Sequence, residues 1–196
     1  MHYITGYIGA MLPYMLSALP LIIISRWFWI RKLGKNGGRT TIWHEAGMII
    51  FFLYLTGLVS QAVIPRWQSV GLDTGSFNLI PFMIFIDTWR EAVLNRNFEP
   101  LIISLAGNIG IFIPMGFLIP WLWRKTCGQT VLLSFLASLA IEICQIPQAR
   151  CSDIDDIWMN TLGGLTGWLI YNFLQKIRPE IKKLSKFFYF LFVIVE

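Results

Sequence analysis

The 196-residue chain has little charge, because Asp, Glu, Lys and Arg make up only 14% of it while hydrophobic residues make up 56%. A soluble domain carries about a quarter charged residues. A soluble globular domain is therefore excluded, and an integral membrane protein is indicated. The net charge of +5 requires no nucleic-acid partner, since membrane topology accounts for where the basic residues lie.

Cysteine and histidine are also scarce, with three and two copies. Cys127, Cys144 and Cys151 form no CxxC pair and fall at three different expected depths, so we predict neither a disulfide nor a metal cluster. The sequence has no activated serine or cysteine pattern and no phosphate-binding loop. We therefore expect no cofactor and no resident metal.

Long apolar runs dominate the rest of the chain. A membrane-spanning helix needs about 20 apolar residues, and five segments qualify: residues 7–30, 46–65, 101–123, 131–147 and 157–173. We predict an all-α fold, a polytopic membrane helix bundle of about five transmembrane helices. Residues 1–196 are expected to form a single membrane domain.

Three basic segments indicate the orientation. Residues 31–39, 124–125 and 176–186 hold most of the Lys and Arg and only one acidic residue, Glu180. Since Lys and Arg accumulate in cytoplasmic loops, we expect an external N-terminus and a basic cytoplasmic tail at residues 174–196. The acidic residues of the other loops then face outward.

The external connection at residues 66–100 contains an amphipathic stretch. Its apolar residues recur at helical spacing, with charged residues opposite them. The apolar positions are Phe82, Phe85, Ile86, Trp89 and Val93. We predict an amphipathic helix that lies on the outer leaflet and begins after Pro81.

Polar side chains interrupt the last three apolar segments. A carboxylate inside lipid costs roughly 2–3 kcal/mol or more, so it usually faces a protein interior or a water-filled cavity. Asp153, Asp156 and Asn160 share one helix face, and Gly164 and Gly167 extend that face inward. Small residues there allow another helix to approach closely.

The preceding segments offer matching groups. Ser134, Ser138, Glu142 and Gln145 share one face of the fourth segment. Glu142 lies roughly 9 Å below the outer end of its segment, at a depth similar to that of Asn108 on the third. We therefore predict that three helices converge on one polar pocket in the outer half of the bilayer.

Simpler explanations stay open for each of these groups. The acids that begin the fifth segment can favour the helix dipole, with Ser152 and Asp155 as a capping box. The amides can be interhelical hydrogen bonds worth under about 1–2 kcal/mol each. Arg150 is either a partner of Glu142 or an interfacial anchor, and Glu45 is expected to be an interfacial charge without function.

Four pieces of sequence, taken in order, resemble the VanZ-like family of bacterial membrane proteins. They are Asn-Leu-Ile-Pro-Phe at 78–82, Asn-Ile-Gly-Ile-Phe-Ile-Pro-Met-Gly at 108–116, Glu-Ile-Cys-Gln at 142–145, and Asp-Ile-Asp-Asp at 153–156 followed by Asn-Thr-Leu-Gly-Gly at 160–164. The resemblance covers residues 77–173 as a VanZ-like core. It implies the bacterial cytoplasmic membrane. The founding member is associated with low-level resistance to teicoplanin, a lipid-tailed glycopeptide antibiotic, and the family implies no defined reaction.

The first functional hypothesis is a binding or shielding protein. An outward polar pocket would hold a lipid-linked or lipid-tailed ligand, either a lipoglycopeptide antibiotic or a cell-wall precursor. The expected ligand-binding residues are Asn78, Asn108, Glu142, Gln145, Arg150, Asp153, Asp156 and Asn160.

The alternative is an outer-leaflet membrane enzyme acting on a lipid or cell-wall precursor. A deep, protonated Glu142 beside ionised Asp153 and Asp156 is the difference in environment that acid–base catalysis needs. The same three carboxylates could instead hold a divalent cation. Transport is the weakest hypothesis, because no inverted repeat is evident in the sequence.

Overall fold

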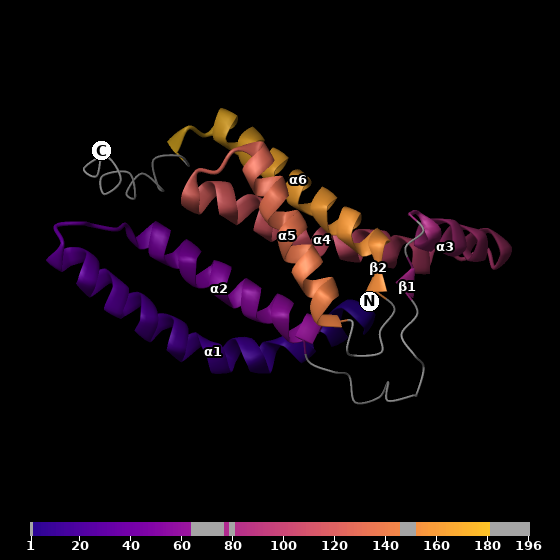
Figure 1. Cartoon of the computed structure of the whole chain (residues 1–196), viewed down its shortest axis with the longest axis horizontal. Helices are drawn as coiled ribbons and strands as arrows, with labels where there is room; N and C mark the ends of the chain where they lie inside the picture. Colours follow the sequence, from indigo (N-terminus) through magenta and orange to yellow (C-terminus); the bar gives the residue numbers. More distant parts are fainter. Residues whose placement is uncertain (1, 64–76, 79–80, 146–151, 181–196) are drawn as a thin grey trace. The chain divides into compact units, whose positions relative to one another are not determined.

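In a computed structural model, the chain is described at residues 2–63, 77–78, 81–145 and 152–180 (Figure 1). These residues form six helices and two very short strands. In chain order they are α1 His2–Lys35, α2 Ile42–Val63, β1 Phe77–Asn78, α3 Met83–Leu94, α4 Glu99–Trp123, α5 Cys127–Gln145, β2 Ser152–Asp153 and α6 Ile154–Ile177. The predicted all-α class is confirmed.

Within this described part, four segments are long and apolar enough to cross a membrane. They are Gly9–Lys35, Ile42–Ser60, Leu105–Trp123 and Cys127–Gln145. The count is one below the expected five. The fifth predicted segment is indeed helical and, at 24 residues, reaches about 36 Å. α6 is not among the four candidates, and its sequence after Asp156 includes polar and small residues such as Asn160, Gly163 and Asn172.

The helices divide into two compact units. One comprises Met1–Gln61, Leu118–Lys125 and Ile170–Glu196, and the other comprises Ala62–Phe117 and Thr126–Leu169. All of the predicted site residues belong to the second unit. The expectation of one membrane domain over residues 1–196, with a core at 77–173 and a basic tail, stays a prediction.

In the first unit, α1 and α2 form a hairpin across a short basic turn. Gly37 has a φ of 75°, a left-handed conformation that glycine adopts without a steric penalty and that commonly ends a helix. The amide of Gly38 closes the turn by donating to the carbonyl of Leu33 at 3.0 Å. Gly57 of α2 faces the sulfur of Met15, where a Cβ would lie 3.3 Å away. The hairpin therefore packs closely.

In the second unit, glycines let α6 lie directly against α4 and α5. A Cβ built on Gly116 of α4 would overlap the carbonyl of Gly164, and one on Gly167 would overlap the carbonyl of Ile113. A Cβ on Gly164 would overlap the hydroxyl of Ser134 on α5. The expected close approach at the glycine stripe is confirmed. Its partners are helices of the same chain, so these glycines are not available to a second copy.

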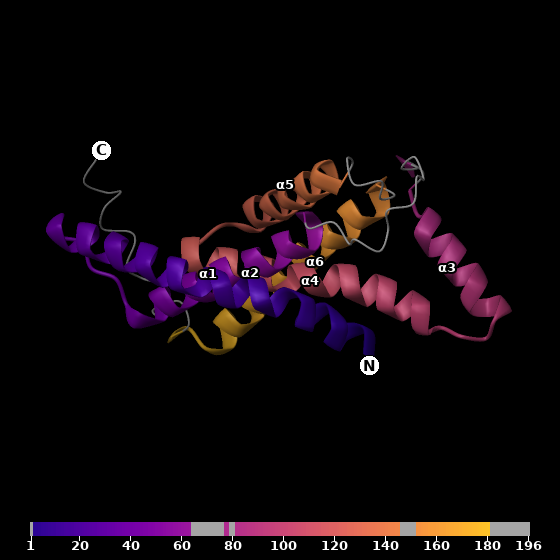
Figure 2. The ribbon, with the colours of Figure 1, turned by 90° about the horizontal axis from the view of Figure 1, so that it is seen from below.

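The amphipathic segment is helical as predicted. α3 spans Met83–Leu94 and leads through a short turn into α4 (Figure 2). The end of α3 is closed by the amides of Asn95 and Asn97, which donate to the carbonyls of Glu91 and Ala92. The ring of Trp89 lies edge-on to Phe98, with centroids 6.0 Å apart, so α3 is tied to the start of α4.

Candidate functional site

The site is built around the beginning of α6, where segments distant in sequence meet. β1 and β2 pair in parallel, with Phe77 opposite Ser152 and Asn78 opposite Asp153. This pairing brings the residues that precede α3 beside the residues that precede α6. The side chains of Asn78 and Asp153 are outside the described part. The strand register alone shows that the backbones of these two predicted ligand-binding residues are neighbours.

Asp155 ties the start of α3 to α6. Its Oδ1 accepts a hydrogen bond from the backbone N–H of Phe82 at 2.5 Å and one from the indole N–H of Trp158 at 2.7 Å. The Phe82 and Trp158 rings lie 5.3 Å apart. Asp155 is fully buried. Its Oδ1 thus contacts both its own helix and the segment that begins α3. A residue that only caps its own helix would not need the second contact.

Phe82 has an unusual backbone at this contact. It is the N-cap residue of α3 and adopts a φ of 67° and a ψ of 12°, which is the left-handed region. That conformation costs a residue with a side chain about 1–2 kcal/mol. The hydrogen bond to Asp155 and the ring contact with Trp158 offset this cost. Strained backbone of this kind is typical of ligand clamps and active sites.

A second polar contact joins α4 to α6. The side-chain amide of Asn108 donates to Oδ1 of Asp156 at 2.5 Å, and both side chains are half-buried. The residues are 48 positions apart in sequence. Two of the predicted site residues are therefore in direct contact, as the expected convergence of the third and fifth segments requires.

A third contact joins α6 to α5. The amide of Asn160 donates to the hydroxyl of Ser138 at 2.9 Å, and both side chains are buried. Within the described part of the chain, Oδ1 of Asn160 and Oγ of Ser134 are buried and have no hydrogen-bond partner. Buried polar atoms are usually paired, so this layer retains unused hydrogen-bonding capacity.

Glu142 lies on the same face of α5 as these serines. The buried residues of that helix are Thr130, Ser134, Ser138 and Glu142, which recur every four residues and so face one side. Glu142 is in the last turn of α5 and is 6% exposed, while Gln145 is half-buried at the end of the helix. Arg150 lies outside the described residues, and its predicted pairing with Glu142 stays a prediction.

The arrangement suits recognition through hydrogen bonds. Its half-buried layer consists of Asn108, Asp156 and Gln145, and its buried layer includes Ser138, Glu142 and Asn160. Across the described residues, no group of three or more His, Cys, Asp or Glu side chains is placed to hold a metal ion. The proposed cation site also involves the side chain of Asp153, which the structure does not describe.

The sequence interpretation missed the role of Asp155 and the partners that hold it. Phe82 ends the family motif at 78–82, and Asp155 lies inside the family motif at 153–156. That both residues belong to family motifs was the sequence feature that could have indicated a contact between them. Trp158, one turn after Asp155, is the other indication, because an indole N–H within an apolar segment needs an acceptor.

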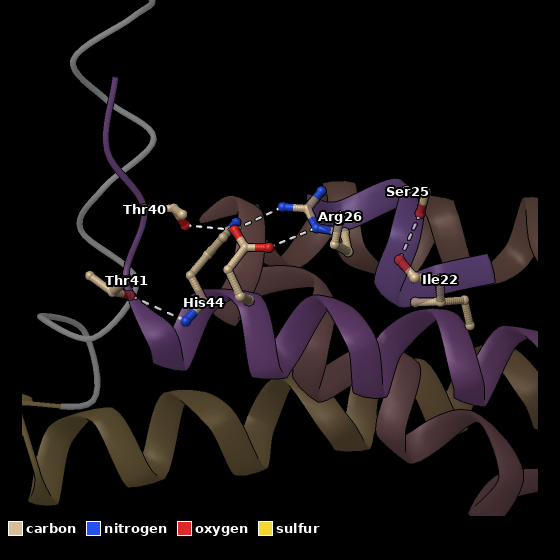
Figure 3. A network of polar contacts seen from close by, with 7 residues as sticks. Ile22, Ser25, Arg26, Thr40, Thr41 and His44 are labelled. Carbon is tan, nitrogen blue, oxygen red and sulfur yellow. Dashed lines mark hydrogen bonds and ion pairs between the residues drawn. The ribbon is translucent and has the colours of Figure 1, made fainter. Parts of the chain in front are cut away.

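The first unit contains a polar network that the sequence interpretation also missed (Figure 3). Arg26 of α1 donates from Nε and Nη2 to the two carboxylate oxygens of Glu45 on α2, each at 2.8 Å. Thr40 donates to the same carboxylate at 2.7 Å. The side chain of Glu45 is only 12% exposed and forms an ion pair with Arg26, and the expectation that Glu45 is an interfacial charge without function stays a prediction. Arg26 is a charged residue within the first apolar run, and this position could have indicated that it needs an acidic partner on a neighbouring helix.

Comparison with known proteins adds one match. The family model described as VanZ/LLP1 matches residues 47–175, which include α3 to β2 and most of α2 and α6. No curated protein matches the chain, and neither does any solved structure.

Proposed function

The chain belongs to the VanZ/LLP1 family of membrane proteins, and we propose that it binds the polar head of a lipid-linked or lipid-tailed ligand. The ligand's hydrocarbon chains remain in the bilayer while its head enters the polar cluster at the start of α6. The proposed ligand-binding residues are Asn78, Asn108, Glu142, Gln145, Arg150, Asp153, Asp156 and Asn160.

The contact between Asn108 and Asp156 carries the proposal. Two polar side chains from α4 and α6 meet at 2.5 Å, and both are half-buried, so they remain partly accessible. A half-buried amide and carboxylate can also recognise the hydroxyl, amide or ammonium groups of a ligand head.

The proposed orientation has the site on the outer side of the bacterial cytoplasmic membrane. The basic turn that follows α1 and the basic pair that follows α4 then lie in the cytoplasm. An external N-terminus and a cytoplasmic tail require an odd number of crossings. α6 is therefore proposed to cross the membrane in addition to the four apolar candidates, with its polar side chains turned toward α4 and α5.

Two ligands fit this location and chemistry. A lipoglycopeptide antibiotic such as teicoplanin carries hydroxyl, amide and ammonium groups on a lipid-tailed molecule. A lipid-linked cell-wall precursor combines a prenyl chain with a sugar and peptide head. Binding the antibiotic would keep the antibiotic away from its target and give low-level resistance. Binding the precursor would instead limit the antibiotic's access to the precursor.

The test is antibiotic susceptibility in a sensitive Gram-positive host. The intact protein is compared with empty vector and with Asp156→Asn and Glu142→Gln at matched membrane levels. We expect the intact protein to raise the inhibitory concentration of teicoplanin several-fold, with little change for vancomycin, which lacks the lipid tail. Both variants should lose this protection. Glu99→Gln removes an exposed acid at the start of α4 and should retain it.

An intact protein that gives no protection would reject the resistance function. Binding is then measured directly, with the purified protein in nanodiscs and a fluorescent lipid-linked cell-wall precursor. If neither the precursor nor teicoplanin binds more tightly to the intact protein than to Asp156→Asn, the binding proposal is also rejected.

An outer-leaflet enzyme is the second candidate, and the two carboxyl environments favour it. Glu142 is buried whereas Asp156 is half-buried, and such a difference separates the acid and base roles in many active sites. Lipid mass spectrometry of membranes with the intact protein or with Glu142→Gln tests it. A lipid or precursor species that changes only with the intact protein would favour catalysis over binding.

A further inference from the structure

The strongest feature outside the polar cluster is the exposed apolar face of α3. Its members are Phe82, Phe85, Ile86, Trp89 and Val93, which are each between 39% and 55% exposed. Phe98, just beyond the helix, adds a ring that is 45% exposed and contacts Trp89. A continuous apolar patch of this kind marks an interaction surface in a folded protein.

The remaining sides of α3 have different chemistry. Asp87, Arg90 and Glu91 are exposed and lie away from the ring of Trp89 at helical spacing. Ala92, three residues after Trp89 and seven after Phe85, lies at one edge of the apolar face, and because it is only 2% exposed, this edge packs against the chain itself. The helix is therefore amphipathic, with its charged side exposed and its apolar side about half exposed, beyond the contacts of Phe82 with Trp158 and of Trp89 with Phe98.

Both ends of α3 are fixed to helices of the membrane unit. At its start, Phe82 is held by the carboxylate of Asp155 and by the ring of Trp158. In its middle, Trp89 contacts Phe98, which directly precedes α4, and its end is closed by the turn that leads to Phe98. The candidate span within α4 begins at Leu105. α3 is thus presented next to the bilayer in a set orientation.

We propose that the apolar face of α3 docks into the lipid interface of the leaflet in which α4 and α6 begin. The continuity of this face with the apolar surface of α4 identifies lipid as the occupant, since both surfaces meet at Phe98. The aromatic residues are of the kind that favour the membrane–water interface. The docking needs no ligand, so it holds whether or not the polar cluster binds one.

The charges on α3 indicate which lipids it needs. A helix that binds through attraction to anionic lipids carries many Lys and Arg on its polar face. α3 instead carries Asp87, Arg90 and Glu91, so burial of apolar surface is the driving force. Neutral phosphatidylcholine should therefore suffice.

Spin-label accessibility tests this docking. The full chain, with its three native cysteines replaced by alanine, receives one cysteine at Phe85 or Val93 on the apolar face, or at Asp87 or Glu91 on the charged side. Each variant is spin-labelled and placed in phosphatidylcholine nanodiscs at one copy per disc. Collision rates with oxygen, which concentrates in lipid, and with a water-soluble nickel complex are then measured.

We expect the oxygen-to-nickel ratio to be several-fold higher at positions 85 and 93 than at positions 87 and 91. Equal ratios at all four positions would place the apolar face in water and overturn the proposal. Low collision rates with both reagents at 85 and 93 would mean that protein covers the face, which also overturns it. A further fall in both rates in discs with two copies would identify a second chain as the occupant.

Discussion

Removing the carboxylate of Glu45 should destabilise the α1–α2 hairpin. Glu45 accepts two hydrogen bonds from Arg26 at 2.8 Å and one from Thr40 at 2.7 Å. The Arg26 and Glu45 side chains are only 11% and 12% exposed. Glu45→Ala therefore leaves a guanidinium without its partner in a largely desolvated place.

The size of the effect follows from that burial. Breaking a fully buried ion pair costs about 3–5 kcal/mol. About a tenth of each side chain remains accessible to solvent, so we expect a loss of about 2–3 kcal/mol for Glu45→Ala. Thr40→Val removes one hydrogen bond and leaves the ion pair, and should cost about 1 kcal/mol. Replacing both Arg26 and Glu45 with methionine removes both charges and should recover most of the loss.

The assay is unfolding in mixed micelles with increasing SDS, followed through the fluorescence of the nine tryptophans. The expected order of stability is intact protein, then Thr40→Val, then Glu45→Ala, with the double methionine variant above Glu45→Ala. If Glu45→Ala costs no more than Thr40→Val, the pair is well solvated and the reasoning fails. It also fails if the double variant is less stable than Glu45→Ala.

Two further changes probe the unit that holds the polar cluster. Gly116→Ala forces a methyl group into the carbonyl of Gly164 and should cost at least about 2 kcal/mol in the same unfolding assay. Gly110→Ala lies on the same helix with open space around it and should be neutral or slightly stabilising, so equal losses would contradict the packing. Asp155→Ala leaves the N–H of Phe82 without its acceptor, at about 1–3 kcal/mol, and should speed amide hydrogen exchange in α3. Asp155→Asn keeps an acceptor oxygen and should exchange more slowly than Asp155→Ala.

The contacts at the start of α6 connect the two surfaces to which functions are proposed. Asp155 holds the beginning of α3, and its neighbour Asp156 holds Asn108 of α4. Both acids lie in the first turn of α6. A change in how α3 lies on the membrane would therefore act on Asp155, the residue next to the half-buried carboxylate of Asp156. Variants at Asp155 are expected to affect both surfaces, whereas variants at Asp156 should affect only the polar cluster.

The sequence by itself determined the features that depend on neighbouring residues along one helix. Apolar runs of sufficient length indicated the all-α class and the approximate positions of the helices, because the bilayer core offers no water and so requires each spanning segment to satisfy its own backbone hydrogen bonds. Helical spacing also identified the shared face of Ser134, Ser138 and Glu142 and the apolar face of α3. The ordered motifs indicated the family, because their residue types and their order are properties of the chain itself.

Only the tertiary structure decided which residues on different helices meet. Asn108 and Asp156 are 48 positions apart, and Phe82 and Asp155 are 73 apart, so no local pattern relates them. Their contact depends on how far α6 slides along α4, which the close packing at Gly116 and Gly164 sets. The pairing of Arg26 with Glu45 depends likewise on the register of the α1–α2 hairpin. Sequence periodicity gives the face on which a side chain lies, but the fit of one helix surface against another gives its depth and its partner.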